Sequence, residues 1–310
     1  MSLNITGEGD SFWEGIKIWH SSALSYVDAG IYNWYTLSPG LLVAQPFVAP
    51  NLTSDEFKKV RKKRSCPALP LPDIDLAHEQ IIDPMLARLK AANVTFSVTP
   101  VKTFAKFGDL YNEMWFNAYH GSGSNAIYGG RLISRKDIAN NSENIIPTFR
   151  KVMEKFNGQV VFGGHLVNPG HGVPDPEGSI SAVHPVFRDT ADIGIYLYFT
   201  TSCMSSTARA QAQETLTNTV GDMIRAVTPN SAVYSNEVST ATFVNAEFGL
   251  TAQGDINEPK WQDAFWGPIY PKLVTIKEKY DPDGVFWAKS TPGSEKWVLQ
   301  DETILCKAPS

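Results

Sequence analysis

The chain has 310 residues, of which 43% are hydrophobic and 19% are charged, and its net charge is −5. This balance is typical of a globular protein with a large core, and it argues against a nucleic-acid partner, which requires a basic surface. The longest apolar run, at 193–199, is far too short to cross a bilayer. The first residues lack the basic start and apolar centre of a signal peptide, so we expect none here.

Cysteines are sparse and fit no metal site. The chain has three, so at least one thiol has no partner within it, and their spacing is not that of a zinc site: Cys66, Cys203 and Cys306. Four Asn-x-Ser/Thr triplets are compatible with chance or with glycosylation on a secretory route: Asn4, Asn51, Asn93 and Asn140. The localisation and the disulfide state stay open.

The first elements alternate between helix and strand. Ser11 and Glu14 form a capping box, which predicts that a helix begins there. Periodicity and turn residues predict a helix over 11–30, strands over 31–37 and 41–48, and a helix over 53–64. The basic run at 58–64 is typical of a solvated helix end, with nuclear localisation or proteolytic processing as the alternatives. The Pro-rich segment after it is interpreted as an inserted loop.

The middle of the chain continues the alternation. Further helices are predicted over 76–92, 103–119, 144–156 and 206–227, and further strands over 94–101, 126–134, 159–167, 192–202 and 231–238. Strands interleaved with long helices, some at hairpin spacing, predict an α+β fold in which a large antiparallel sheet is backed by helices. We place a domain over 1–230 and a separate C-terminal segment over 231–310.

The C-terminal segment is strongly aromatic. Apolar residues at helical spacing predict an amphipathic helix over 261–280, and Asp281-Pro282-Asp283-Gly284 predicts a turn that ends it. The aromatic residues are Trp261, Phe265, Trp266, Tyr270, Tyr280, Phe286, Trp287 and Trp297. Rings of this size are normally buried, so we expect another surface to cover them.

This segment resembles a known signature. The sequence FWG at 265–267, followed by IK-x-KYDPDGVF at 276–286, is similar to the C-terminal signature of FAD-linked oxidases of the berberine-bridge-enzyme type. The fungal, isoamyl-alcohol-oxidase-like branch is similar also at GSEKW and the late ILC. The resemblance extends to three earlier segments, at 12–30, 129–135 and 181–189, and therefore covers most of the chain.

The resemblance implies a flavin oxidoreductase that acts on an alcohol or a similar small secondary metabolite. In the family, a Tyr-x-Asn triplet faces the flavin, and Tyr234-Ser235-Asn236 matches it. Tyr234 would then handle the substrate proton and Asn236 would contact the flavin. From the residues alone, a buried strand tyrosine is the favoured interpretation of Tyr234, and Asn236 is also compatible with a turn residue at a strand end. The resemblance also implies the antiparallel substrate domain of these oxidases and a C-terminal segment that packs on their FAD domain.

No glycine-rich phosphate cradle follows a strand in this sequence, so the chain resembles the substrate-binding half of the family without the N-terminal FAD domain. FAD is the cofactor by resemblance, although this chain alone is also compatible with none. The partners expected are a small-molecule substrate and either a second copy or a separate FAD-domain chain. Two alternatives remain: a flavin-free descendant that catalyses a cofactor-independent cyclisation or isomerisation, and a non-catalytic partner or truncated pseudoenzyme.

Other polar residues are weaker candidates for substrate binding. Arg131 and His165 lie on predicted strands and Glu237 follows the triplet; each is equally compatible with a structural role. His165, His171 and His184 occur within twenty residues, but their spacing is not that of metal ligands, so we expect no metal site.

Overall fold

A computed structural model describes most of the chain. The described residues are 1–50, 82–114, 126–170, 181–200, 204–234, 238–239, 254–255, 260–300 and 304–308. The helix predicted over 53–64, its basic run and the Pro-rich segment lie outside this part. Within it, no helix is long and apolar enough to cross a membrane.

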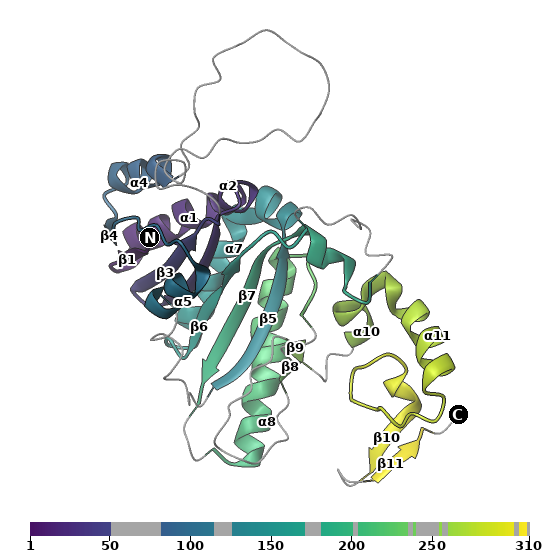
Figure 1. Cartoon of the computed structure of the whole chain (residues 1–310). Helices are drawn as coiled ribbons and strands as arrows, with labels where there is room; N and C mark the ends of the chain where they lie inside the picture. Colours follow the sequence, from purple (N-terminus) through teal and green to yellow (C-terminus); the bar gives the residue numbers. More distant parts are fainter. Residues whose placement is uncertain are drawn as a thin grey trace.

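A seven-stranded sheet forms the centre of the molecule, in the order β4-β1-β3-β2-β6-β7-β5, and every neighbouring pair is antiparallel. Its strands are β1 (Leu3–Thr6), β2 (Tyr32–Ser38), β3 (Leu41–Val48), β4 (Thr95–Val98), β5 (Ala126–Ser134), β6 (Val160–Leu166) and β7 (Thr190–Phe199). The longest pairings are those of β7 with β6 and with β5, and these three strands lie side by side in Figure 1. The predicted antiparallel α+β sheet is confirmed.

Helices cover one face of this sheet. They are α1 (Gly9–Ser21), α2 (Ala23–Asp28), α4 (Ile82–Ala91), α7 (Arg135–Lys155), α8 (Ser206–Glu214) and α9 (Gly221–Val227), whereas α5 (Phe107–Met114) buries no residue and lies beside the end of β3. α7 lies behind the long strands (Figure 1) and buries Ile145, Phe149 and Val152 against them. Burying a side chain of this size contributes about 1.5–3 kcal/mol, so this layer is the main stabilising core.

Two predicted helices have different bounds in the structure. The first begins at Gly9 rather than Ser11, and its N-cap, Glu8, makes no side-chain cap hydrogen bond, so the predicted capping box is wrong. α7 begins nine residues before the predicted 144, because the Ser134 hydroxyl accepts a hydrogen bond from the Asp137 amide and caps it. Pro147 lies inside this helix and does not end it. α8 and α9 are joined by the π-helical turn η2 (Thr215–Val220), so the predicted helix 206–227 is continuous.

The predicted helix 261–280 is broken in the structure. It consists of α10 (Trp261–Phe265), the short 3₁₀ turn η4 (Gly267–Ile269) and α11 (Tyr270–Tyr280). Gly267 has a φ of 60° and Pro268 follows it, so the backbone changes direction there. After the turn η5 (Ser294–Lys296), β10 (Trp297–Gln300) and β11 (Ile304–Lys307) form an antiparallel hairpin. A small parallel pair joins β8 (Val238–Ser239) to β9 (Gly254–Asp255).

Candidate functional site

The two faces of the sheet differ in what covers them. Along β2, β6 and β7, one set of alternate side chains is buried under the helices, including Tyr35, Phe162 and Tyr196. The other set, including Trp34, His165 and Ile193, is only half-buried. We call this second face, which points away from α1 and α7, the outer face. Aromatic and aliphatic side chains left partly uncovered mark it as a surface for binding another group.

Strand register arranges the outer face in rows. One row runs across four strands through Trp34, His165, Ile193 and Leu132, which are direct cross-strand neighbours. The next row consists of Thr36, Gly163, Ile195 and Gly130. Because two of its four members are glycine, this second row carries few bulky side chains. Both glycines are buried, so Thr36 and Ile195 are the more accessible members of this row.

His165 and Trp34 form the polar part of this face. Their ring centroids are 4.1 Å apart and the ring planes are inclined by 59°. Burial lowers the pKa of His165, and the carboxylate of Asp192 acts in the opposite direction but less strongly. The imidazole is therefore neutral at pH 7 and can both donate and accept a hydrogen bond.

A polar cluster lies directly beneath these residues, on the helix side. The Tyr35 hydroxyl donates to Asp192 Oδ2 at 2.9 Å, and His20 Nε2 lies 3.7 Å from the same oxygen. Tyr35, Asp192 and His20 are at most 1% exposed. Gly164 makes room for this cluster, because a Cβ there would lie 3.0 Å from Asp192 Oδ1. Burial raises the pKa of Tyr35 far above its usual value, so this phenol keeps its proton.

Tyr234 follows closely after the residue that ends the row containing His165. Leu132 pairs with Ala232 through hydrogen bonds between their backbones, which continues that row by one more segment. Two residues later, the ring of Tyr234 contacts that of Phe187, with centroids 5.4 Å apart. Phe187 belongs to the 3₁₀ turn η1 (Pro185–Asp189), which leads directly into β7. Tyr234 is therefore attached to the same sheet edge as the outer face.

The remaining candidates from the sequence are placed differently or lie outside the described residues. Arg131 is 8% exposed, and its guanidinium donates to Thr228 Oγ1 at 3.2 Å and to the Thr228 carbonyl at 2.8 Å. Through these contacts Arg131 stabilises the end of α9. They do not support its predicted role in substrate binding. Asn236 and Glu237 lie outside the described residues, so their predicted roles stay predictions.

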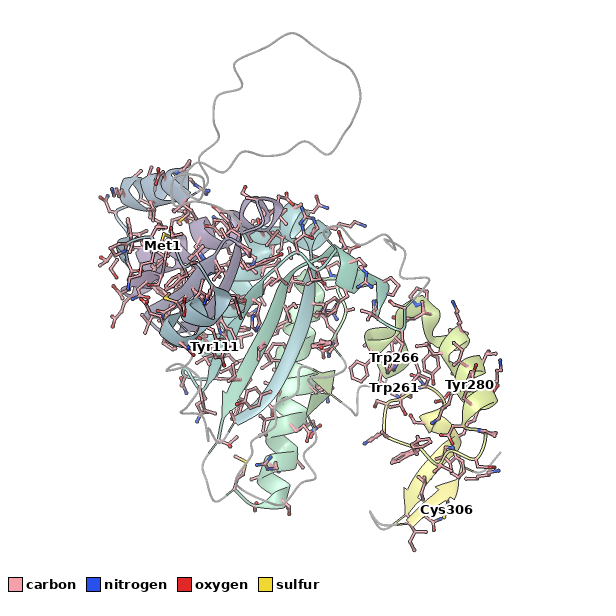
Figure 2. All side chains as sticks on the ribbon, viewed as in Figure 1. Met1, Tyr111, Trp261, Trp266, Tyr280 and Cys306 are labelled. Atoms are coloured by element: carbon pink, nitrogen blue, oxygen red, sulfur yellow. The ribbon has the colours of Figure 1, made fainter. Side chains whose placement is uncertain are left out.

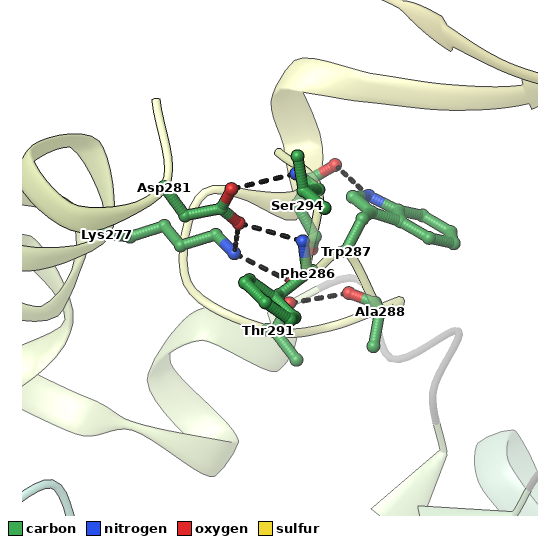
Figure 3. A network of polar contacts seen from close by, with 8 residues as sticks. Lys277, Asp281, Phe286, Trp287, Ala288, Thr291 and Ser294 are labelled. Carbon is green, nitrogen blue, oxygen red and sulfur yellow. Dashed lines mark hydrogen bonds and ion pairs between the residues drawn. The ribbon is translucent and has the colours of Figure 1, made fainter. Parts of the chain in front are cut away.

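A hydrogen-bonded network shapes the predicted Asp-Pro-Asp-Gly turn (Figure 3). Asp281 forms an ion pair with Lys277 and accepts hydrogen bonds from the amides of Val285 at 2.8 Å and Phe286 at 3.0 Å. Lys277 Nζ also donates to the Phe286 carbonyl at 2.7 Å. The ion pair with Lys277 lowers the pKa of Asp281. The turn after α11 is thus held by one carboxylate and one ammonium group.

This turn presents apolar side chains to solvent. Tyr280, Val285 and Phe286 are 74%, 76% and 80% exposed. Figure 2 shows Tyr280 on the outer side of α11, whereas Trp261 and Trp266 lie toward the rest of the molecule. We call Tyr280, Val285 and Phe286 the exposed tip. The tryptophans are partly covered by their own segment, for example through the hydrogen bond from Trp266 Nε1 to the Ser290 carbonyl at 3.0 Å.

A phosphate site is not found among the described residues. α7 follows β5 directly, as helices do at nucleotide sites, but the buried Asp137 carboxylate lies at its N-terminus and accepts from Asn230 and Ser231. A second negative charge would be repelled there. A cavity of about 670 Å³ lies elsewhere, between the end of β3 and α5, and its lining includes neither His165 nor Tyr234. The described residues also hold no group of side chains able to bind a metal ion.

Comparisons with known proteins agree with the signature in the C-terminal segment. A family model described as berberine and berberine like matches residues 253–290. FAD-linked oxidoreductase ZEB1 of Gibberella zeae is 27% identical over 308 residues, which cover 98% of this chain and 46% of the relative. FAD-linked oxidoreductase sor8 of Hypocrea jecorina is 26% identical over 308 residues, covering 97% of this chain and 44% of the relative. The chain thus spans somewhat less than half the length of these curated relatives.

Solved structures show the same fold. The VAO-type flavoprotein MtVAO615 from Myceliophthora thermophila C1 superposes with a TM-score of 0.72 at 20% identity, over 99% of this chain and 49% of that protein. MtVAO713 from the same organism gives a TM-score of 0.73 at 19% identity, over 99% and 50%. The predicted resemblance is confirmed, and the long antiparallel sheet is that of flavoprotein oxidases.

Proposed function

This chain is related to the fungal FAD-linked oxidoreductases with a berberine-type C-terminal segment, and from this kinship we propose that it supplies the substrate-side half of a flavin-dependent oxidase. The substrate class is an alcohol or a similar small secondary metabolite. The observation that carries the proposal is the outer face, where the row through Trp34 and His165 ends at Ala232, two residues before Tyr234.

The outer face fits the ring system of a flavin. The second row of the outer face includes Gly163. A Cβ added there would lie 3.2 Å from the Tyr35 carbonyl oxygen, so the neighbouring backbone is close to this position. Half-buried apolar residues beside it, such as Ile193 and Ile195, provide the contacts that a flat ring needs. The described residues offer no matching site for the diphosphate of FAD. We propose that a second polypeptide segment binds that part of the cofactor.

The residues of this chain would bind and orient the substrate at that face. Bound FAD supplies the hydride acceptor, as flavins do in oxidases. Neutral His165 donates or accepts one hydrogen bond to a substrate hydroxyl, and Trp34 limits the positions that a small molecule can take. Tyr234 would take the hydroxyl proton from the end of the row. Asn236, two residues later, would contact the edge of the flavin.

The exposed tip supports a partner in the same proposal. Val285 and Phe286 are held outward by Asp281 and Lys277, and so do not collapse onto their own segment. An ordered, exposed pair of apolar side chains usually marks a contact surface. We propose that this tip packs on a flavin-binding chain or on a second copy of this chain.

The experiment is a flavin titration with and without a partner. The purified chain is mixed with FAD, alone and together with the separately produced N-terminal half of a fungal relative, and the visible flavin spectrum is recorded. We expect this chain to shift the spectrum of the flavin held by the partner half, because the outer face excludes water from one side of the ring. Trp34→Leu should weaken the shift.

Trp13→Leu is the matched control, because this tryptophan is also half-buried but lies on α1, on the helix side of the sheet. It should leave the spectral shift unchanged. The proposal fails if neither the chain nor the mixture changes the flavin spectrum. Turnover of a candidate substrate after complete flavin removal would instead support a flavin-free descendant, and partner binding without any spectral change would support a non-catalytic subunit.

A further inference from the structure

His184 joins three segments that surround Tyr234. Its Nδ1 accepts a hydrogen bond from the Val186 amide at 3.1 Å and so caps η1. Its Nε2 lies 3.2 Å from the Asp263 carbonyl oxygen on α10. The ring is 9% exposed and holds one end of the sheet against the C-terminal segment.

These two contacts define the protonation state of the ring. An amide N–H can only donate, so Nδ1 must carry no proton. A carbonyl oxygen can only accept, so Nε2 must carry one. The neutral tautomer with hydrogen on Nε2 is therefore the form that makes both contacts, and a doubly protonated ring would lose the bond from Val186.

The backbone around the ring leaves room for the contact between His184 and α10. Gly267, in the break between α10 and α11, has a φ of 60°, and a Cβ there would lie 2.5 Å from His184 Nε2. Only glycine combines this conformation with so close an approach. The break in the predicted helix 261–280 is thus also the place where the imidazole is held.

Both segments that His184 joins, η1 and α10, also hold Tyr234 or the residue before it. On one side, the capped turn η1 carries Phe187, whose ring contacts Tyr234 at 5.4 Å. On the other side, Val233, the residue before Tyr234, donates its amide to the Ala264 carbonyl at 3.0 Å, beside Asp263 on α10. A movement of either η1 or α10 would therefore displace the tyrosine.

We propose that His184 is a positioning residue for Tyr234: its neutral imidazole locks η1 to α10, and protonation releases the tyrosine from its place beside the outer face. The inference rests on the catalytic role proposed for Tyr234. It adds a residue that touches neither substrate nor flavin and that makes the proposed reaction sensitive to pH.

The direction of the pH effect follows from the surroundings of the ring. Burial lowers the pKa of His184; the contact with the Asp263 backbone and the Asp263 charge oppose this shift, and Arg131 on β5 adds to it. On its own turn, Arg188 points to Ser181 instead. Because the folded-state pKa lies below the ordinary value of about 6.5, the lock is complete above that pH. It weakens as the pH falls, by at most about tenfold per pH unit.

The test measures the lock without flavin or turnover. Amide hydrogen-exchange protection of Val186 and Val233 is recorded by NMR between pH 5 and 8, together with the contact between the Phe187 and Tyr234 rings. In the unmodified protein we expect both protection factors and the ring contact to decrease below about pH 6.5. His184→Asn keeps an acceptor near Nδ1, whereas His184→Gln keeps a donor near Nε2.

The two variants should separate the contacts. His184→Asn should retain protection at Val186 and lose it at Val233, His184→Gln should do the reverse, and neither should respond to pH. His165→Asn, which removes the other half-buried titrating histidine of the sheet, should leave the pH response unchanged. Protection independent of pH in the unmodified protein, or a Phe187–Tyr234 contact that survives in both His184 variants, would overturn the proposal.

These outcomes are independent of the proposed oxidase function. A pH-dependent lock in a protein that never alters a flavin spectrum would leave the role of His184 as a structural finding and remove the proposed reaction. A flavin response combined with a pH-independent lock would remove the proposed role of His184 and leave the proposed reaction in place. Activity measurements then follow as a third readout, in which the unmodified protein should lose turnover below about pH 6.5 and His184→Gln should retain only the part of this loss that protonation of His165 causes.

Discussion

The contact between Tyr35 and Asp192 shows what a single residue does under the candidate site. The two residues are far apart in the sequence, fully buried, and joined by a 2.9 Å hydrogen bond. Asp192 Oδ1 and both nitrogens of His20 make no hydrogen bond within the described structure, so Asp192 depends heavily on the tyrosine. Leaving a buried polar group unsatisfied is the costliest way to lose a hydrogen bond.

We therefore expect Tyr35→Phe to lower the free energy of unfolding by about 1–3 kcal/mol, because it strands the Asp192 carboxyl group. The measurement is the midpoint of urea unfolding at pH 7. Tyr198→Phe on β7 is the control, since its hydroxyl makes only a 3.5 Å contact to Gln159 at the surface. That change should cost less than about 0.5 kcal/mol. Equal losses in the two variants would contradict this account of the buried cluster.

The sequence could not reveal this cluster or the role of His184. His165 and Tyr234 were predictable because one lies on a strand and the other matches a family triplet. Trp34 becomes the neighbour of His165 only through the register of β2 and β6. The sequence favours a structural role for His184 over a metal ligand, but it cannot identify the partner on α10, which is distant in the chain. Residue types can indicate candidate residues for a site, but strand register and packing determine which of them are in contact.

At the scale of elements, Asp281 determines the conformation of the turn that follows α11. Its carboxylate accepts from two backbone amides and from Lys277, so one side chain joins the helix end to the backbone that follows it. We expect Asp281→Asn to increase amide hydrogen exchange at Val285 and Phe286 while exchange within α7 stays unchanged. Asparagine retains one acceptor but loses the ion pair and the second oxygen.

Asp283→Asn is the matched control, because this carboxylate is exposed two residues later in the same turn. Its exchange pattern should equal that of the unmodified protein. The pH dependence has a defined sign: Lys277 lowers the pKa of Asp281 below its usual 3.8, so the network is intact above that value and is lost as the pH falls further. A turn that loosens between pH 7 and 5 would show that other groups hold it.

The elements were predictable to different degrees for physical reasons. β5 was predicted with its observed bounds because a continuous β-rich run lies between clear turns. α7 was predicted too short, because the cap at Ser134 lies far upstream of the predicted start. The short strands β1, β10 and β11 have too few residues for a periodic pattern, and only pairing defines them. The break at Gly267 depends on the approach of His184, which is a tertiary contact.

For the whole molecule, two uncovered surfaces are the main finding. The outer face carries Trp34 and His165, and the exposed tip carries Tyr280, Val285 and Phe286. They lie on different parts of the chain, so one small ligand cannot cover both. A second polypeptide can, and the relatives are about twice as long as this chain. This arrangement is what the proposed substrate-side half of an oxidase requires.

The exposed tip makes a prediction about assembly. In the absence of a flavin-binding partner, we expect the chain to self-associate, because a second copy is then the available cover for Val285 and Phe286. Phe286→Glu should shift the protein toward monomer in sedimentation velocity, weakening association by roughly tenfold to a hundredfold, as expected when the burial of one large apolar side chain, about 1.5–3 kcal/mol, is lost.

Phe107→Glu provides the matched comparison, since Phe107 is 69% exposed on α5 and lies outside the tip. It introduces the same charge and removes the same ring. If both variants change the association equally, the effect comes from net charge and overall hydrophobicity, and the tip is not the interface. If only Phe286→Glu acts, and the same change also abolishes the spectral response to the flavin-binding half, then one surface serves both partners, and self-association is the resting state of an incomplete oxidase.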